Sequence, residues 1–336
     1  MNKQLSYLTS LFGASGSEGD VRQAVINEIR PYCEKVEVDR LGNVIAFKRG
    51  TMEPPFTLMF SAHMDEVALM VTHIDGDGYL KFDSVGGIDP RILPGKHVAV
   101  GRNKLHGVIG VLAPHLAKDE ENAPKMDDLF IDIGAKDKED AERAVSVGDL
   151  IGFETIYQEF GEDLVRAKAL DDRAGCYILI EMIKRTIPFD AYFVFSVMEE
   201  IGCYGAKTSA FGVRPQYAVI VEGTTAGDIH ADKDKSSVCA LGKGPVVSFM
   251  DRSAIYDREF YRLAMEAARD ANIPVQTKEA VSGGNESGTL QSAMGGCKVL
   301  AISVPCRYIH SPVSVASLND IENALRLALA VFNKLI

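Results

Sequence analysis

A run of short strands interrupts a chain that otherwise alternates helices and strands. From about residue 68 to residue 164, strand-forming segments follow one another with glycine and proline between them, which is typical of a small β-barrel or β-sandwich. On either side, apolar residues recur with helical and strand spacing in alternation. We therefore expect an α/β domain made of residues 1–67 and 165–336, with an inserted β domain at residues 68–164.

The periodicity also predicts individual elements. Expected helices span residues 5–12, 17–30, 138–145, 172–185, 256–271 and 318–335. Expected strands span residues 35–38, 43–47, 57–62, 67–74, 79–85, 97–100, 108–113, 129–133, 191–197, 217–221 and 298–304. Ser17 and Asp20 resemble a capping box that opens the second helix, which should end before Pro31. Residues 118–128 are polar and aperiodic, which indicates an exposed loop.

The acidic composition argues against two classes of partner. Lys and Arg total 36 against 47 Asp and Glu, a formal net charge of -11, so neither nucleic acid nor an anionic membrane is an expected partner. No apolar run approaches the roughly 18 residues of a membrane-spanning helix, and the chain begins with an amphipathic helix rather than a signal sequence. We expect a cytoplasmic protein. The six cysteines show no Cys-x-x-Cys spacing, so reduced thiols are expected and a thiolate zinc site is not.

Two adjacent carboxylates, Asp171 and Asp172, stand where the helix 172–185 should begin, in the sequence ALDDRAG. Alone, such a pair indicates only a helix N-terminus, where negative charge suits the helix dipole. However, other metal-capable side chains follow apolar strand-like runs: His63 and Asp65 after 57–62, Glu199 and Glu200 after 191–197, Glu222 after 217–221, and His310 after 298–304. Each could be an ordinary rim or turn residue, but together they predict a two-metal hydrolase.

The spacing of these residues suggests a separate role for each. His63 and Asp65 are two apart on an extended chain and share a face, so the carboxylate can orient the imidazole of a metal ligand. Side chains of Glu199 and Glu200 diverge, so one could hold a metal while the other takes the proton of a metal-bound water. With one glutamate kept as base, two histidines and three carboxylates remain. This set suits two divalent ions, Zn²⁺, Co²⁺ or Mn²⁺, with one carboxylate bridging them.

The motifs resemble those of the M42 family of dinuclear metalloaminopeptidases, the glutamyl, deblocking or tetrahedral aminopeptidases. They are His63-Met64-Asp65-Glu66, the ALDDRAG stretch, Glu199-Glu200-Ile201-Gly202, Arg307-Tyr308-Ile309-His310-Ser311-Pro312, and residues 86–95 (GGIDPRILPG). The resemblance implies a mixed central sheet flanked by helices, as in dinuclear zinc exopeptidases, with an inserted small β-barrel or PDZ-like domain. It also implies hydrolysis of N-terminal residues from short peptides, and dimers that build a tetrahedral dodecamer.

Carried over by position, the resemblance implies a role for each site residue. His63 and Glu222 would be terminal metal ligands, and Glu200 and His310 would complete the coordination of the two ions. Asp171 would bridge the ions through its carboxylate, and its peptide bond to Asp172 would be cis. Asp65 would orient His63, and Glu199 would be the general base.

Two departures from the family pattern leave alternatives open. Where the family commonly shows Asp-Val-Thr, this chain has Glu222-Gly223-Thr224. Where the family has the stretch Gly-Gly-Thr-Asp-Ala-Gly, residues 283–288 of this chain read GGNESG. One alternative is therefore an assembly protein with a weakened site. Another is a glycoside hydrolase using two carboxylates. The histidine ligands, the absence of Trp and an aromatic content of 8% argue against a glycoside hydrolase.

The five remaining histidines show no ligand spacing and are expected to be structural: His73, His97, His106, His115 and His230. His230 lies in a polar loop, residues 228–236, which could approach the substrate.

Overall fold

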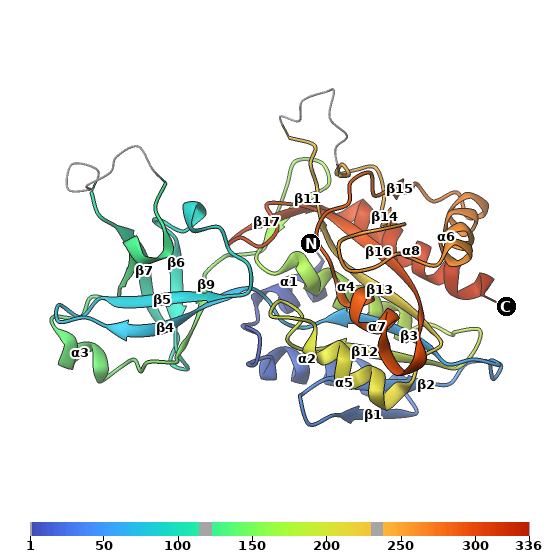
Figure 1. Ribbon diagram of the computed structural model, residues 1–336, viewed down its shortest axis with the longest axis horizontal. Helices are drawn as coiled ribbons and strands as arrows, with labels where there is room; N and C mark the ends of the chain where they lie inside the picture. Colours follow the sequence, from blue (N-terminus) through green and yellow to red (C-terminus); the bar gives the residue numbers. More distant parts are fainter. Residues whose placement is uncertain (1, 114–122, 230–237, 336) are drawn as a thin grey trace.

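A large mixed sheet lies at the centre of the larger of two lobes (Figure 1). The structure is a computed structural model and describes residues 2–113, 123–229 and 238–335. In spatial order the sheet contains β1 (Lys35–Val38), β2 (Val44–Lys48), β12 (Ala191–Ser196), β3 (Leu58–His63), β13 (Tyr217–Thr225), β16 (Lys298–Arg307), β17 (Ser314–Ser317), β11 (Leu164–Ala167) and β10 (Gln158–Phe160). Two short strands lie beside this path: β14 (Val246–Val247), which pairs with β16, and β15 (Gln276–Thr277), which pairs with β14.

The four central strands of this sheet run in the same direction. β12 and β13 are parallel to β3 on either side of it, and β16 is parallel to β13. Every residue of β3 is buried, as expected for a strand covered on both faces. Because the four strands are parallel, their carboxyl ends lie along one edge of the sheet, where open α/β sheets bind their ligands.

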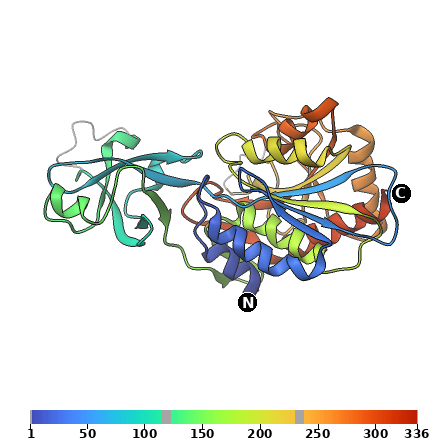
Figure 2. The same cartoon turned by 90° about the horizontal axis from the view of Figure 1, so that it is seen from below.

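Helices cover both faces of the sheet (Figure 2). The helices that pack on one face are α1 (Lys3–Ser10), α2 (Gly19–Ile29), α4 (Leu170–Ile183), α6 (Arg258–Asp270) and α8 (Leu318–Lys334). The core on that face includes Phe60 of β3, whose ring lies 5.3 Å from that of Phe193 and 5.0 Å from that of Phe332. The helices on the opposite face are α5 (Tyr204–Val213) and α7 (Glu286–Gln291).

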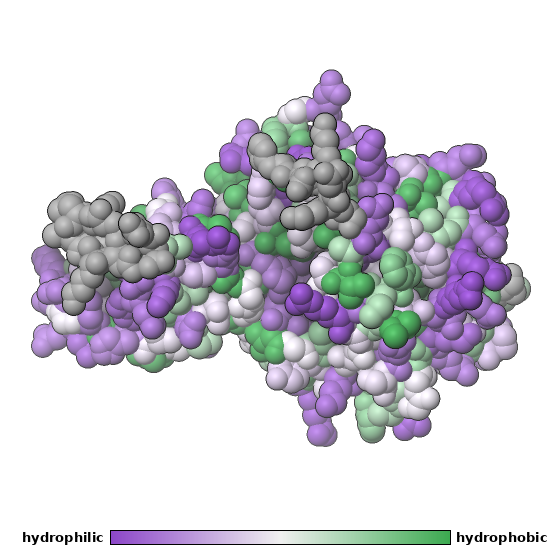
Figure 3. Space-filling view, turned by 45° about the horizontal axis from the view of Figure 1, so that its top comes forward, coloured by the Kyte–Doolittle hydropathy of each residue, from purple (hydrophilic) through white to green (hydrophobic). Residues whose placement is uncertain are grey.

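The smaller lobe is a closed barrel with its own apolar core. Its strands, in order around the barrel, are β4 (Ala68–Ile74), β5 (Leu80–Val85), β8 (Leu129–Asp132), β7 (Leu105–Val111), β6 (His97–Val100) and β9 (Leu150–Phe153). Helix α3 (Lys138–Glu142) packs beside it, and Leu80, Ile131 and Ile151 are fully buried inside. Figure 3 shows the barrel as a separate lobe, with polar side chains over most of the visible surface. The predicted fold class, a mixed sheet flanked by helices with a small barrel, is confirmed.

Several predicted elements differ in extent from the observed ones. β13 continues to Thr225 and β16 to Arg307, so Glu222 lies inside a strand rather than after one. The capping box at Ser17 is wrong, because the N-cap of α2 is Glu18, whose side chain instead accepts hydrogen bonds from the Gly16 and Met198 backbone N–H groups. The helix does end before Pro31 as predicted.

Other elements were not predicted at all. The helices α5 and α7 are short and contain glycine, and the buried face of α5 consists mostly of small residues, so neither sequence shows a strong amphipathic pattern. Single 3₁₀ turns lie at Arg30–Tyr32, Pro90–Ile92, Met126–Asp128 and Ala293–Gly295. The last residues of the predicted loop 118–128 form one of them, while 118–122 lie outside the described residues. Within the described ranges, no helix has the length and apolar character needed to cross a membrane.

Candidate metal centre

The predicted site residues come from five segments that meet at the carboxyl edge of the sheet. His63 ends β3, the pair Glu199 and Glu200 follows β12, and Glu222 lies near the end of β13. His310 is in the loop between β16 and β17, and Asp171 is at the start of α4. The register pairs Ser196 of β12 with His63. Residues that are far apart in sequence are therefore neighbours in space.

Asp171 lies between two imidazoles. Its Oδ1 is 3.4 Å from Nε2 of His63, and its Oδ2 is 3.6 Å from Nε2 of His310. Each carboxylate oxygen thus faces a different histidine, an arrangement suited to a carboxylate shared by two ions. The peptide bond between Asp171 and Asp172 is cis, as the family resemblance implied.

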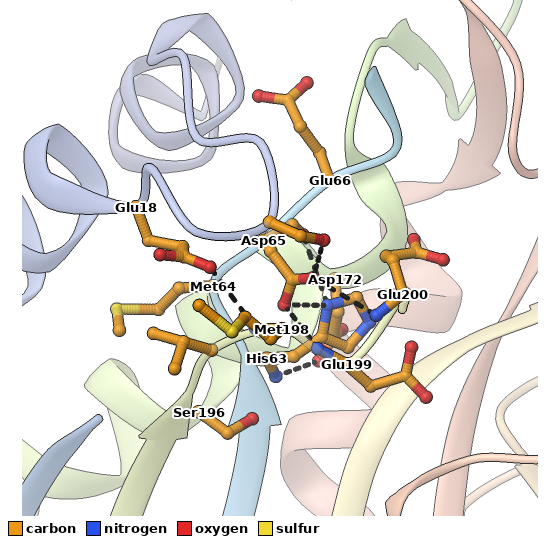
Figure 4. A network of polar contacts seen from close by, with 12 residues as sticks. Glu18, His63, Met64, Asp65, Glu66, Asp172, Ser196, Met198, Glu199 and Glu200 are labelled. Atoms are coloured by element: carbon orange, nitrogen blue, oxygen red, sulfur yellow. Dashed lines mark hydrogen bonds and ion pairs between the residues drawn. The ribbon is translucent and has the colours of Figure 1, made fainter. Parts of the chain in front are cut away.

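Asp65 connects His63 to the turn that contains the two glutamates (Figure 4). Its Oδ1 is 3.5 Å from Nδ1 of His63, and its carboxylate accepts the backbone N–H groups of Glu199 (3.0 Å) and Glu200 (3.1 Å). A third donor is the hydroxyl of Ser15, at 2.6 Å. The backbone oxygen of Asp65 is closer still to His63 Nδ1, at 3.2 Å. Asp65 is fully buried, so its main chain and carboxylate together orient the imidazole, and the carboxylate also fixes the turn after β12.

Two groups of donor atoms are close enough to hold a cation. One contains His63, Glu199 and Glu200, and the other contains Asp171, Glu200 and His310; within each group the ligand atoms lie within 4.8 Å of one another. Glu200 belongs to both groups, and its Oε2 is 3.2 Å from Nε2 of His310. Asp65 is behind the imidazole and contributes to neither.

Glu222 is buried beside these groups but is a member of neither. The next residue, Gly223, donates its backbone N–H to Oδ1 of Asp171 at 3.0 Å. The Glu222 carboxylate accepts a hydrogen bond from Nδ2 of Asn285, and the Ser303 hydroxyl lies 3.4 Å from it. The structure therefore places Glu222 at the edge of the site, directed toward α7.

Asp172 points away from the two groups. Its carboxylate accepts the backbone N–H of His63 (3.2 Å) and of Gly175 (2.8 Å), and it is fully buried. It therefore connects the first turn of α4 to the end of β3. A buried Cβ at Gly175 would lie 2.4 Å from these oxygens, which is why this turn requires glycine.

The pKa values of the site show an excess of negative charge. Burial raises the pKa of Glu199 to about 7 and of Glu200 to about 8, and it raises that of Glu222 well above its ordinary value. Burial alone would lower the pKa of His310, but contact with Asp171 and Glu200 raises it to about 9. Carboxylates so close together in a buried site retain protons unless positive charge is supplied.

The donor set fits divalent cations. Imidazole nitrogens and carboxylate oxygens are ligands for Zn²⁺, Co²⁺ and Mn²⁺, and a pair of such ions would neutralise the crowded carboxylates of Asp171 and Glu200. Cys176 and Cys306 lie nearby, but both are fully buried and burial raises their pKa. Cys203 Sγ lies 3.4 Å from Oε1 of Glu199, but neither of the two donor groups found among the described residues contains a cysteine.

A buried ion-pair cluster behind the site was not predicted. Arg173, with no exposed surface, donates to the backbone oxygens of Leu8 (2.6 Å) and Met64 (2.9 Å) and to Glu66 (3.1 Å). Lys168 also donates to Glu66, at 2.8 Å. The only sequence signal was indirect: Glu66 and Arg173 stand directly beside the motif carboxylates Asp65 and Asp172 in the chain.

The histidines expected to be structural divide by location. His73, His97 and His106 lie in barrel strands and belong to neither donor group. Nδ1 of His106 is 2.6 Å from the Glu154 carboxylate on the surface. His115 and His230 lie outside the described residues.

The chain is similar to a known protein family and to known aminopeptidases. The model of the family described as M42 glutamyl aminopeptidase matches residues 42–327. A putative aminopeptidase of Acetivibrio thermocellus is 38% identical over 327 residues, covering 96% of each chain. The lysyl aminopeptidase of Pyrococcus furiosus is 34% identical over 333 residues, covering 96% of this chain and 94% of that protein.

Solved structures agree with the sequence comparison. The TET1 peptidase of Pyrococcus horikoshii, described as able to assemble into a tetrahedron or a large octahedral shell, is 36% identical to this chain. The two superimpose with a TM-score of 0.86 over 98% of each chain.

Proposed function

Because the chain belongs to the M42 glutamyl aminopeptidase family, we propose that this aminopeptidase removes N-terminal residues from short peptides with the help of two divalent cations. The observation that supports the proposal most directly is the position of Asp171, whose two carboxylate oxygens face two different imidazoles. A carboxylate in that position is suited to bridging two ions.

The proposed ligands follow from the motif resemblance, and all of them except Glu222 also belong to the two donor groups. Asp171 would be shared, His63 and Glu222 would be terminal ligands, and Glu200 and His310 would complete the coordination of the two ions. Zn²⁺ and Co²⁺ suit this mixture of nitrogen and oxygen donors, and Mn²⁺ is an alternative. When bound, the ions polarise the scissile carbonyl and make a water molecule more acidic.

Glu199 is the proposed general base. It lies in the turn after β12, and its backbone N–H donates to the Asp65 carboxylate, so the position of its main chain is fixed. Burial raises the pKa of its carboxyl, and bound cations would offset that rise and leave a carboxylate able to accept a proton. Glu199 would take a proton from the attacking water at its carboxylate and pass it to the leaving amine.

Asp65 is the proposed positioning residue for His63. It lies on the Nδ1 side of the imidazole, so Nε2 remains directed toward Asp171. The same carboxylate fixes the turn with Glu199 and Glu200, so one residue aligns a proposed ligand and the proposed base.

The assembly is also a proposal. Residues 68–164 would form an inserted domain that pairs two subunits, and the dimers would build a dodecamer. The similarity to the TET1 peptidase of Pyrococcus horikoshii supports this proposal. The location in the cytoplasm, expected from the sequence, stays a prediction.

An activity panel tests the proposed function. The purified protein is incubated with aminoacyl anilides and short peptides, with and without a chelator, and with a soluble cellulose derivative as the control substrate. The expected result is release of N-terminal residues that chelation abolishes and added Zn²⁺, Co²⁺ or Mn²⁺ restores. Cleavage of cellulose alone would favour the glycoside hydrolase, and no cleavage of any substrate would favour an assembly protein with a weakened site.

A further inference from the structure

Asn285 is a buried amide at the N-terminus of α7 that contacts the proposed ligand Glu222. Its Oδ1 accepts the backbone N–H of Ser287 at 2.7 Å and so caps the helix. Its Nδ2 donates to Oε1 of Glu222 and to the hydroxyl of Tyr256, the latter at 3.1 Å. Both ends of the side chain are therefore engaged, and only 6% of the residue is exposed.

The orientation of this amide is determined by its partners. A backbone N–H can only donate, so the atom that accepts from Ser287 must be the oxygen of Asn285. The NH₂ group must then face the Glu222 carboxylate. Tyr256 holds this arrangement from behind, because its hydroxyl donates to Asp251 at 2.6 Å and accepts from Asn285.

Asp251 is itself fixed. Its carboxylate accepts the backbone N–H groups of Ser253 (2.6 Å) and Ala254 (2.8 Å). A buried series of hydrogen bonds thus runs from this loop through Tyr256 and Asn285 to Glu222. Among the described residues, the next donor to the Glu222 carboxylate is the Ser303 hydroxyl, at 3.4 Å.

Glu222 needs such support, because its side chain has one more rotatable bond than an aspartate and enters a site rich in negative charge. The carboxylates of Asp171 and Glu199 repel the carboxylate of Glu222, while the buried side chain of Lys278 attracts it. A hydrogen bond to Oε1 neutralises part of the charge and leaves Oε2 available. An aspartate at this position would be withdrawn from Asn285 by about one bond length.

We propose that Asn285 is a positioning residue that holds Glu222 in place to bind one of the two ions, and that the two residues function as a matched pair. The inference rests on the proposed two-metal function. It explains how the long side chain of a glutamate can be held at this position of β13.

Substitution of Asn285 by serine tests the contact without removing the cap. Serine also caps helices well, but it is too short to reach Glu222. In chelator-treated protein titrated with Co²⁺, we expect Asn285→Ser to bind one of the two ions about tenfold more weakly, the size typical of losing a partner behind a metal ligand. The visible absorption of bound Co²⁺ should change as well. Asn2→Ser makes the same change at the N-cap of α1, where Asn2 accepts from the Leu5 N–H, and should leave binding and spectrum unchanged.

A double-mutant cycle shows whether the effect passes through Glu222. In a Glu222→Asp background the contact is already lost, so Asn285→Ser should then change Co²⁺ affinity less than about twofold. An equal loss in both backgrounds, or wild-type affinity and spectrum in Asn285→Ser, would overturn the inference while leaving the proposed function intact. Wild-type protein that binds fewer than two Co²⁺ ions would overturn both.

Discussion

Asp171 contacts both imidazoles of the site, and its surroundings leave little room for change. The backbone N–H of Gly223 donates to Oδ1, the same oxygen that faces His63. Contacts with His310 and His63 hold the pKa of Asp171 far below its ordinary value despite burial, so this carboxylate is ionised at any pH of interest. An ionised carboxylate between two histidines is the arrangement that a bridging ligand requires.

Replacement of Glu199 by glutamine tests the proposed base. Glutamine has nearly the same shape but cannot accept a proton, so kcat should fall by about 10²–10⁴-fold. The bound ions should remain, because Glu199 is not among the proposed ligands. Turnover on an aminoacyl anilide and metal content should be measured on the same preparation. Normal turnover with full metal content would exclude Glu199 as the base.

Gly223 provides a second test at this scale. A Cβ there would lie 2.8 Å from Oδ1 and 2.9 Å from Cγ of Asp171, so Gly223→Ala should displace the proposed bridging carboxylate. We expect a loss of bound metal and at least about a 100-fold loss of activity, since misplacement near 1 Å has effects of this size. Circular dichroism should remain unchanged.

Gly212→Ala is the matched control for this change. The nearest atom to its Cβ would be Cδ1 of Ile45 at 3.9 Å, an ordinary contact, and the residue lies in α5. Activity should be retained, and the melting temperature should stay the same or rise slightly, because alanine is the better helix former. Equal effects of the two alanines would show that the close approach to Asp171 is unimportant.

At the scale of the elements, a buried cation connects α1, α4 and β3. Arg173 on α4 donates to Leu8 O in α1 and to Met64 O just after β3, and Glu66 and Lys168 complete the cluster. These contacts hold the segment with His63 and Asp65 against the N-terminal helix. The cluster therefore supports the site without contacting the proposed ions.

Arg173→Met should show the importance of this connection. Among the described residues, the substitution leaves Glu66 with Lys168 as its one cationic partner. It also removes the donor to several buried carbonyls, so the free energy of unfolding should fall by about 3–5 kcal/mol. Denaturant unfolding measures the change. Arg143→Met, which removes an exposed ion pair with Asp140, is the control and should leave the unfolding midpoint unchanged. A loss in the control as large as in Arg173→Met would contradict the account.

Strands and site residues were predictable to different degrees. Long apolar runs predicted the central strands, and the metal-capable residues that follow them predicted where the site would lie. The contacts of Glu222 could not be predicted, because they depend on α7, whose six residues have no apolar periodicity. The cluster of Arg173 and Glu66 was missed for a related reason, since a buried ion pair looks like surface charge in a sequence.

At the scale of the whole molecule, the proposed ions should contribute to stability. Without them, the crowded carboxylates of Asp171, Glu200 and Glu222 either repel one another or must retain protons. A ligand present at about 1,000 times its Kd stabilises a protein by about 4 kcal/mol, so for a chain of 336 residues chelation should lower the melting temperature by roughly 6 °C. Asp171→Asn, which lacks the proposed bridge, should show a much smaller shift. No shift in the wild type on chelation would contradict the proposed site.

The proposed assembly makes a separate prediction. A chain of 36.5 kDa that forms a dodecamer should have a solution mass twelve times that value. Ile156, which is 84% exposed beside the barrel, would be an apolar side chain in contact with water in an isolated subunit. Light scattering on the wild type measures the solution mass. The same measurement on Ile156→Glu shows whether this apolar side chain contributes to the assembly. A monomeric wild type would contradict the assembly without affecting the chemistry.

The central claim is that the site uses two ions, and a metal titration tests it most directly. Chelator-treated protein is supplied with Zn²⁺ or Co²⁺ in steps, and aminopeptidase activity is plotted against ions bound per chain. We predict that activity rises until two ions are bound per chain and no further. Full activity in the metal-free protein, or a maximum at one ion per chain, would contradict the account.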